Sequence, residues 1–211
     1  MTQADLLRSE SLRFRLRHAT DAAHRRLEES LALQDRCRST EGYAAVIARM
    51  WGMYAPLEAE LARVDLGALG LDMESRFKAG WLLTDLAALG FSARDIAALP
   101  RAARIPVLDD PVDALGVLYV VEGASLGGQV ISRQLEARLS VTSQSGGRFF
   151  ASYGARVGET WRAYLAVLEA TGATPDAAAR IEAAALDTFA CFEAWLGEWS
   201  FDPAGRPEVL A

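Results

Sequence analysis

The chain contains only two histidines, His18 and His24, and both fall in one segment with helical apolar spacing. At about 100° per residue, their imidazoles lie about 120° apart around a helix. The core-facing stripe of that helix consists of Leu12, Leu16, Ala19, Ala23 and Leu27. His24 falls on the edge of the stripe, whereas His18 lies on the opposite side. His24 is therefore the imidazole that can serve a buried pocket, where it could act as a metal ligand.

Three polar side chains share a strip of this helix with His24. Thr20 and Glu28 stand one turn to either side of it, and Arg17 lies two turns before it. Glu28 could accept the second N–H of a metal-bound imidazole, and Arg17 could bind a ligand carboxylate. The alternative is a helix histidine paired with Glu28, with Arg17 in solvent and Thr20 packed in the core.

Three glycines interrupt the apolar segment 119–131, Tyr-Val-Val-Glu-Gly-Ala-Ser-Leu-Gly-Gly-Gln-Val-Ile. Each glycine inside a helix costs roughly 1 kcal/mol relative to alanine, so Gly123, Gly127 and Gly128 require a reason. Either a neighbouring element packs against bare backbone, or a flat ligand lies on the helix. The sequence leaves both explanations open.

The elements that position these residues are helices. Helical apolar spacing predicts helices over 10–31, 40–64, 73–88, 92–98, 111–139, 155–171 and 175–198, and no segment has the alternation of a strand. Start signals precede three of them, at Ser39, Asp110 and Thr174. The predicted fold is all-α.

The composition is that of a single compact domain. We expect the domain to span residues 1–198, with a mobile tail over 199–211. The 211 residues are 51% hydrophobic, and the net charge of −6 is interspersed, which disfavours nucleic acid as a partner. No run of eighteen apolar residues and no signal peptide occur, and Cys37 and Cys191 have no partner pattern. We therefore expect a cytoplasmic protein that does not bind a membrane.

Two motifs together resemble the haem oxygenase family. The first is Leu16-Arg17-x-x-Thr20-x-x-x-His24-x-x-Leu27-Glu28, and the second is Leu126-Gly127-Gly128-Gln129-Val130-Ile131. Helix order, length and a closing helix with Phe189, Phe192 and Trp195 extend the resemblance over nearly the whole chain. The run Gly146-Gly147-Arg148-Phe149-Phe150-x-x-Tyr153-Gly154 is similar to the branch that accompanies bacterial phytochromes.

The resemblance implies haem held between a proximal helix and a kinked distal helix. His24 would be the axial iron ligand and Glu28 its hydrogen-bond partner. Thr20 would share the haem-binding strip of His24, and Gly123, Gly127 and Gly128 would form the distal backbone nearest the bound oxygen. Candidates for binding the propionates are Arg17, Tyr119 and Arg162, the last two on weaker grounds.

One position departs from the family pattern. Many members carry a distal aspartate one residue after the first glycine, where it orders the water that supplies a proton, but this chain has Ala124. Either Ser125, Arg133 or another group organises the proton relay, or the chain binds haem without opening it efficiently. A haem carrier or sensor is thus the alternative function.

The activity implied is the O₂-dependent conversion of haem to biliverdin, CO and ferrous iron. The chain has no flavin or nicotinamide fingerprint, so the electrons must come from an external ferredoxin or reductase, for which Arg13, Arg15, His18 and Arg25 form a candidate docking surface. A bacterial phytochrome is the candidate acceptor of the bilin.

Two enzymes of similar helical architecture fit less well. A di-iron oxidase needs Glu-x-x-His motifs on two helices, but both histidines lie on one helix here. A thiamin-degrading enzyme would use Cys191 as a nucleophile, but no histidine remains to activate that thiol. A helical interaction module without a cofactor is the remaining alternative.

Overall fold

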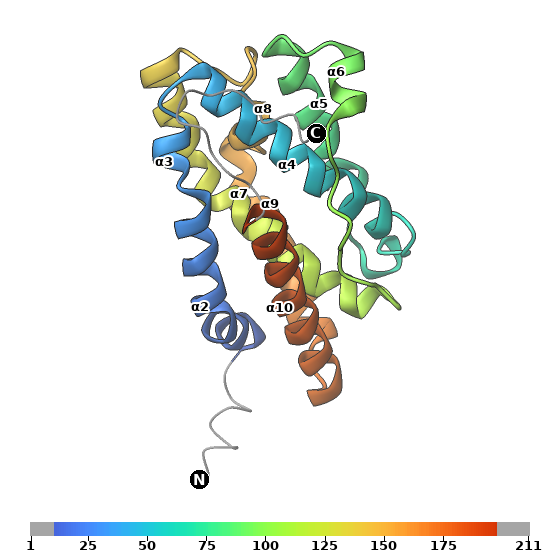
Figure 1. Cartoon of the computed structure of the whole chain (residues 1–211). Helices are drawn as coiled ribbons and strands as arrows, with labels where there is room; N and C mark the ends of the chain where they lie inside the picture. Colours follow the sequence, from blue (N-terminus) through green and yellow to red (C-terminus); the bar gives the residue numbers. More distant parts are fainter. Residues whose placement is uncertain (1–10, 198–211) are drawn as a thin grey trace.

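A computed structural model describes residues 11–197, and every regular element in that range is helical (Figure 1). The α-helices are α2 (Leu12–Leu31), α3 (Leu33–Arg36), α4 (Thr40–Leu61), α5 (Ala79–Ala88), α6 (Ala93–Ala98), α7 (Pro111–Leu139), α8 (Arg148–Ala151), α9 (Val157–Thr171) and α10 (Pro175–Gly197). Three 3₁₀ turns, η1 (Gly67–Leu69), η2 (Glu74–Arg76) and η3 (Gly154–Arg156), lie between them. The all-α prediction is confirmed. The expected tail over 199–211 lies outside the described residues.

The predicted start signals are observed as helix caps. The Ser39 side chain accepts a hydrogen bond from Gly42 N at 3.1 Å, and Asp110 accepts one from Val112 N at 2.8 Å. Helix α7 then continues unbroken through all three glycines as far as Leu139. The kink expected from the resemblance does not interrupt its helical structure.

The predicted helix 73–88 begins later, at Ala79. Residues 74–76 form a 3₁₀ turn, and Phe77 is extended. The carboxylate of Glu58, on α4, accepts hydrogen bonds from Lys78 N (2.6 Å) and Ala79 N (2.9 Å) and so caps the start of α5. Because this cap comes from a distant helix, local sequence patterns could not predict it.

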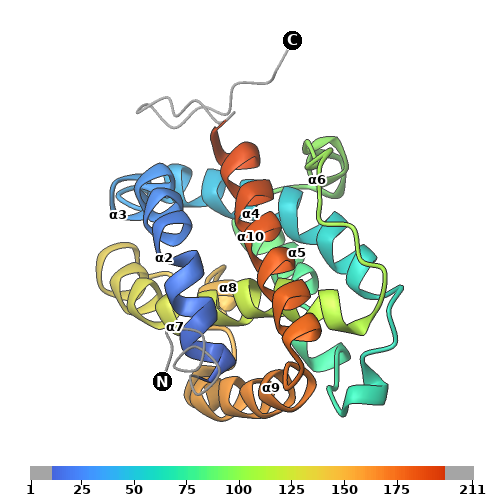
Figure 2. The ribbon, with the colours of Figure 1, turned by 90° about the horizontal axis from the view of Figure 1, so that it is seen from below.

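Helix α10 is the central packing element. It lies beside α2 and crosses α7, while α4 packs mainly on α5 (Figure 2). At the crossing, a Cβ added to Gly116 would lie 2.3 Å from the carbonyl oxygen of Ile181, so the two backbones approach where only glycine fits. Because α2 and α7 both pack on α10, this helix fixes their positions relative to each other.

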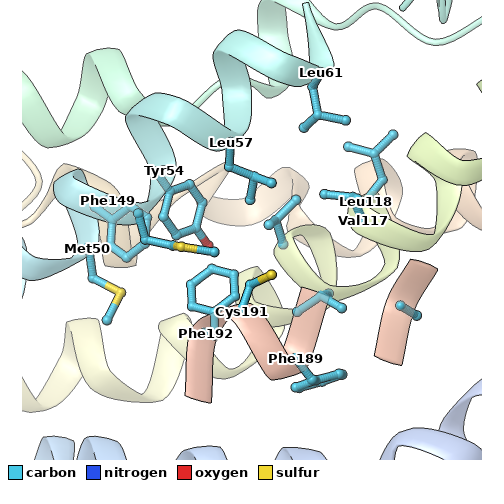
Figure 3. Packing of buried hydrophobic residues seen from close by; sticks show 14 of the residues in the cluster. Met50, Tyr54, Leu57, Leu61, Val117, Leu118, Phe149, Phe189, Cys191 and Phe192 are labelled. Atoms are coloured by element: carbon cyan, nitrogen blue, oxygen red, sulfur yellow. The ribbon is translucent and has the colours of Figure 1, made fainter. Parts of the chain in front are cut away.

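Aromatic rings close the core between α4, α8 and α10 (Figure 3). Tyr54 makes edge contacts with Phe149 (5.1 Å between ring centroids) and with Phe192 (5.9 Å). Leu57 and Leu118 continue the same cluster and are almost fully buried. Such interlocked packing holds helices at fixed relative positions.

By length and composition, one described helix, α7, could span a membrane. More than half of its most apolar window is buried inside the protein, chiefly against α10. Burial of this kind is what a core helix of a helical bundle requires.

Candidate functional site

Helix α2 presents His24 beside the core rather than within it. Four side chains of α2 are buried, namely those of Leu12, Leu16, Thr20 and Ala23. The His24 side chain, by contrast, is 57% exposed. One side of its ring packs edge-on against Phe189 of α10, at 6.0 Å between centroids. The imidazole is therefore anchored by α10 and still accessible to a ligand.

The proposed partner of His24 is in place. Nδ1 of His24 lies 3.5 Å from a carboxylate oxygen of Glu28, one turn further along α2. A carboxylate that accepts a hydrogen bond from Nδ1 of a metal-bound imidazole orients its ring. Nε2 is then the nitrogen that can bind a metal.

The three glycines of α7 have three different surroundings. A Cβ added to Gly128 would lie 2.9 Å from the carbonyl oxygen of Phe150, so this glycine is required by packing. A Cβ on Gly127 would meet nothing within 4 Å, and one on Gly123 only the Trp161 ring, at 3.9 Å. Packing thus explains Gly128 but neither Gly123 nor Gly127.

The α2–α3 segment and α7 approach each other at two points. At one, Thr20 lies close to the Tyr119 hydroxyl; at the other, Leu33 and Gln34 line one small apolar cavity with Ile131 and Gln134. His24 lies between these two points along α2, and the stretch Gly123–Gly127 lies between them along α7.

Cationic and hydroxyl groups gather at the Tyr119 end. Burial raises the pKa of the Tyr119 hydroxyl, while its hydrogen bond with Thr20 and the charges of Arg13 and Arg17 oppose this rise. Thr20 itself is buried and donates to Leu16 O at 2.8 Å. Two guanidinium groups beside a phenol and a threonine suit a carboxylate.

Ala124 and Ser125 lie on different sides of α7. Ala124 is exposed, like Gly127. The Ser125 hydroxyl is buried without a hydrogen-bond partner among the described residues. At about 100° per residue, Ser125 lies on the side of Gln129, away from the side shared by Gly123 and Gly127.

Arg162 stands apart from the Tyr119 group. Its side chain is exposed on α9, with its guanidinium near Gly158 of the same helix. Arg133, the other candidate for a proton relay, is also exposed. By contrast, Trp161 contacts Tyr119 at 5.9 Å between centroids and is the neighbour nearest to Gly123. Trp161 and Arg13 are thus neighbours of Tyr119 that the sequence analysis did not assign to the candidate site.

A buried ion network adjoins the glycine stretch. The Glu122 carboxylate binds Arg76 Nη1 at 2.9 Å, Lys78 Nζ at 2.7 Å and the Tyr153 hydroxyl at 2.8 Å. Lys78 is the only lysine in the chain and is 2% exposed. Two features of the sequence point to this network, a carboxylate within the apolar segment Val-Val-Glu-Gly and a single lysine. The partners of Glu122 could not be predicted, because they are distant along the chain.

The two cysteines are buried thiols. Cys37 lies beside the cavity near α3, and Cys191 lies in the core of α10. Burial raises the pKa of each thiol to about 11. Neither is a thiolate at neutral pH, so Cys191 is not an activated nucleophile.

Two solved structures share the fold of this chain. The fold resembles the NO- and CO-bound heme oxygenase from Neisseria meningitidis, with a TM-score of 0.69, 21% identity, and coverage of 90% of this chain and 92% of that one. It also resembles the heme oxygenase from Leptospira interrogans, with a TM-score of 0.72, 17% identity, and coverage of 90% and 100%.

No curated protein matches the sequence significantly. The family model described as "Heme oxygenase", however, matches residues 10–198, almost the whole chain. The chain therefore belongs to the haem oxygenase family, whose members are enzymes that degrade haem by opening its ring.

Proposed function

We propose that this enzyme binds haem with His24 as the iron ligand and converts it to biliverdin, CO and ferrous iron. The observation that carries the proposal is the pairing of His24 with Gly123 and Gly127, two glycines for which protein packing gives no reason. Both lie between the points where the α2–α3 segment and α7 meet. In this proposal, a planar macrocycle would lie between the imidazole and bare backbone.

Each end of this space suits one part of haem. Arg13, Arg17 and Tyr119 form a polar, cationic end for the propionate carboxylates. Leu33 and Ile131 form an apolar end for the ring edge and its hydrocarbon substituents. The polarity of the space therefore supports one orientation of the substrate along α2.

Bound haem would supply the iron that activates O₂ and the ring carbon that is oxidised. The residues of this chain do the positioning. His24 would hold the substrate through Nε2, and Glu28 would keep the ring oriented through Nδ1. Gly123 and Gly127 would present bare backbone to the bound haem, and Ala124 would add only a methyl group.

The electrons come from outside the chain in this proposal, from a ferredoxin or a reductase. The candidate docking surface on α2 includes Arg13 and His18, both exposed, while Arg15 pairs with Glu182 at 3.3 Å and Arg25 with Asp21 at 2.5 Å. We also propose a cytoplasmic location and a bacterial phytochrome as the acceptor of the bilin, on the similarity of residues 146–154 to that branch of the family.

The second candidate function, a haem carrier, is favoured by Ala124. This exposed side chain has no hydrogen-bonding group to hold a water, and the hydroxyl of Ser125 is buried on another side of α7. A carrier would bind haem through the same groups and release little bilin.

A haem titration followed by turnover tests the proposal. Hemin is added to the wild type, to His24→Ala and to the matched control His18→Ala. Ascorbate is then supplied under air with catalase present. The wild type and His18→Ala should show a sharp Soret band that is replaced by bilin absorption. His24→Ala should lose both, and added imidazole should restore the Soret band.

Three outcomes count against parts of the proposal. An unchanged Soret band in His24→Ala would refute the ligand assignment. A wild type that binds hemin but forms no bilin would support the carrier. A wild type that does not bind hemin would refute haem as the substrate.

A further inference from the structure

The back of α7 rests on the segment from Arg148 to Tyr153, which we call the strut. Within it, Phe150 O lies 2.9 Å from the position of a Cβ on Gly128, and Ala151 O accepts a hydrogen bond from Gln129 Nε2 at 2.7 Å. At its end, the Tyr153 hydroxyl binds Glu122 at 2.8 Å. The strut therefore contacts α7 at three positions. Its helix α8 packs on α7 (Figure 2).

These contacts flank the glycines that face the proposed haem site. Gly123 and Gly127 share one side of α7, about 40° apart. Glu122 lies about 100° from Gly123 in one direction, and Gly128 lies about 100° from Gly127 in the other. A displacement of the strut would thus move the backbone of Gly123 and Gly127.

The strut is itself fixed by one carboxylate. Asp85, on α5 and 1% exposed, accepts hydrogen bonds from Arg148 N (2.8 Å) and Phe149 N (2.7 Å), one to each oxygen. Just before the strut, Gly146 O accepts a hydrogen bond from the buried Tyr43 hydroxyl at 2.7 Å. The strut contains no Asp or Glu of its own, so its start depends on these two distant groups.

Each link in this chain of contacts is stiff. A buried carboxylate with two backbone donors cannot move without leaving charged or polar groups unsatisfied. The contact between Gly128 and Phe150 O is backbone against backbone and has no rotamer through which to relax. The position of Asp85 is therefore transmitted to α7.

We propose that Asp85 is a positioning residue that fixes, through the strut, the height of Gly123 and Gly127 above the haem site. This inference rests on the proposed function for its role in haem chemistry. The connection from Asp85 to α7 consists of contacts within the protein and does not depend on haem.

The matched variants are Asp85→Asn and Asp95→Asn. Both carboxylates accept backbone hydrogen bonds at the start of a helix, but Asp95 does so in the exposed capping box of α6, from Ser92 N at 2.9 Å. An asparagine amide can accept only one of the two bonds that Asp85 accepts. Tyr153→Phe is a second variant that removes the contact with Glu122 while keeping the ring.

The first measurement is hydrogen exchange in the haem-free proteins. We expect backbone amides of residues 119–131 to exchange at least about tenfold faster in Asp85→Asn, with α2 and α9 unchanged and Asp95→Asn like the wild type. Unaltered exchange in α7 would overturn the proposal, as would equal acceleration in every helix. If Asp85→Asn does not fold, we expect Tyr153→Phe to show the same faster exchange in residues 119–131, with α2 and α9 unchanged.

The second measurement is the C–O stretching frequency of the CO complex of ferrous haem, together with the CO dissociation rate. Because CO would lie against the Gly123–Gly127 stretch, Asp85→Asn should broaden or shift the band and change the dissociation rate at least about threefold. An unchanged band and rate would overturn the link to the haem site. Failure of the wild type to bind hemin would refute the proposed function. Hydrogen exchange would then still test whether Asp85 positions α7.

Discussion

Lys78 Nζ lies 2.7 Å from Glu122 Oε1, and the two side chains are 2% and 1% exposed. The second oxygen of Glu122 binds Arg76, which is 7% exposed. Charges this deeply buried depend on their partners, because water cannot replace them. The only lysine in the chain thus joins the loop before α5 to the helix that carries the glycines.

Removal of this lysine should therefore be costly. We expect Lys78→Met to lower the free energy of unfolding by about 3 kcal/mol, because it leaves a buried carboxylate with one cation fewer. Arg63→Met, which breaks an exposed pair with Glu60, should change it by less than about 0.5 kcal/mol. Urea unfolding measures both, and equal small losses would show that Arg76 alone neutralises Glu122.

Alanine at the two adjacent glycines should have opposite effects on stability. Gly127→Ala adds a methyl group in open space and gains about 1 kcal/mol in helix propensity. Gly128→Ala places its Cβ 2.9 Å from a backbone oxygen of the strut and should lose about 1–3 kcal/mol. Thermal unfolding of the haem-free proteins tests the pair, and a destabilised Gly127→Ala would mean that this position is already filled by packing.

The stabilising variant should also be the functionally damaged one. In the proposed site, the added methyl group of Gly127→Ala occupies space above the iron. We expect it to slow bilin formation at least about tenfold while hemin still binds, which would appear as a retained Soret band under turnover conditions. Bilin formation at the wild-type rate in this variant would show that Gly127 does not face the bound haem.

The buried thiols predict a specific pH dependence. The pKa of each cysteine is about 11 in the folded protein, against about 8.5 in an unfolded chain. Between these values the unfolded chain releases protons that the folded protein keeps, so raising the pH favours unfolding. Cys37→Ala/Cys191→Ala should lose less stability than the wild type between pH 8.5 and 11, whereas an identical loss would show that the folded thiols ionise normally.

Ser152 combines two unfavourable features. Its backbone has φ +49° and ψ −124°, a region that favours glycine, and its hydroxyl is buried without a partner among the described residues. Ser152→Gly should therefore raise the melting temperature by a few degrees, and more than Ser140→Gly, which changes an exposed left-handed residue at the end of α7. A lower melting temperature for Ser152→Gly would indicate that the hydroxyl holds a bound water.

The sequence predicted the long helices because each one buries an apolar stripe of its own. It did not predict the late start of α5, which depends on the Glu58 carboxylate of α4. It also did not assign roles to Asp85, Lys78 or Trp161, since each acts through a partner from a distant part of the chain.

By itself, the sequence determined the all-α fold, the placement of His24 and Glu28 on one strip, and the family. These depend on spacing within one segment, or on two motifs read together. Only the tertiary structure showed that packing requires Gly128, because a neighbour across space, and not the local helix, distinguishes Gly128 against Phe150 from the open Gly127. The same holds for Ser125, because only the structure shows that its hydroxyl is buried without a partner among the described residues.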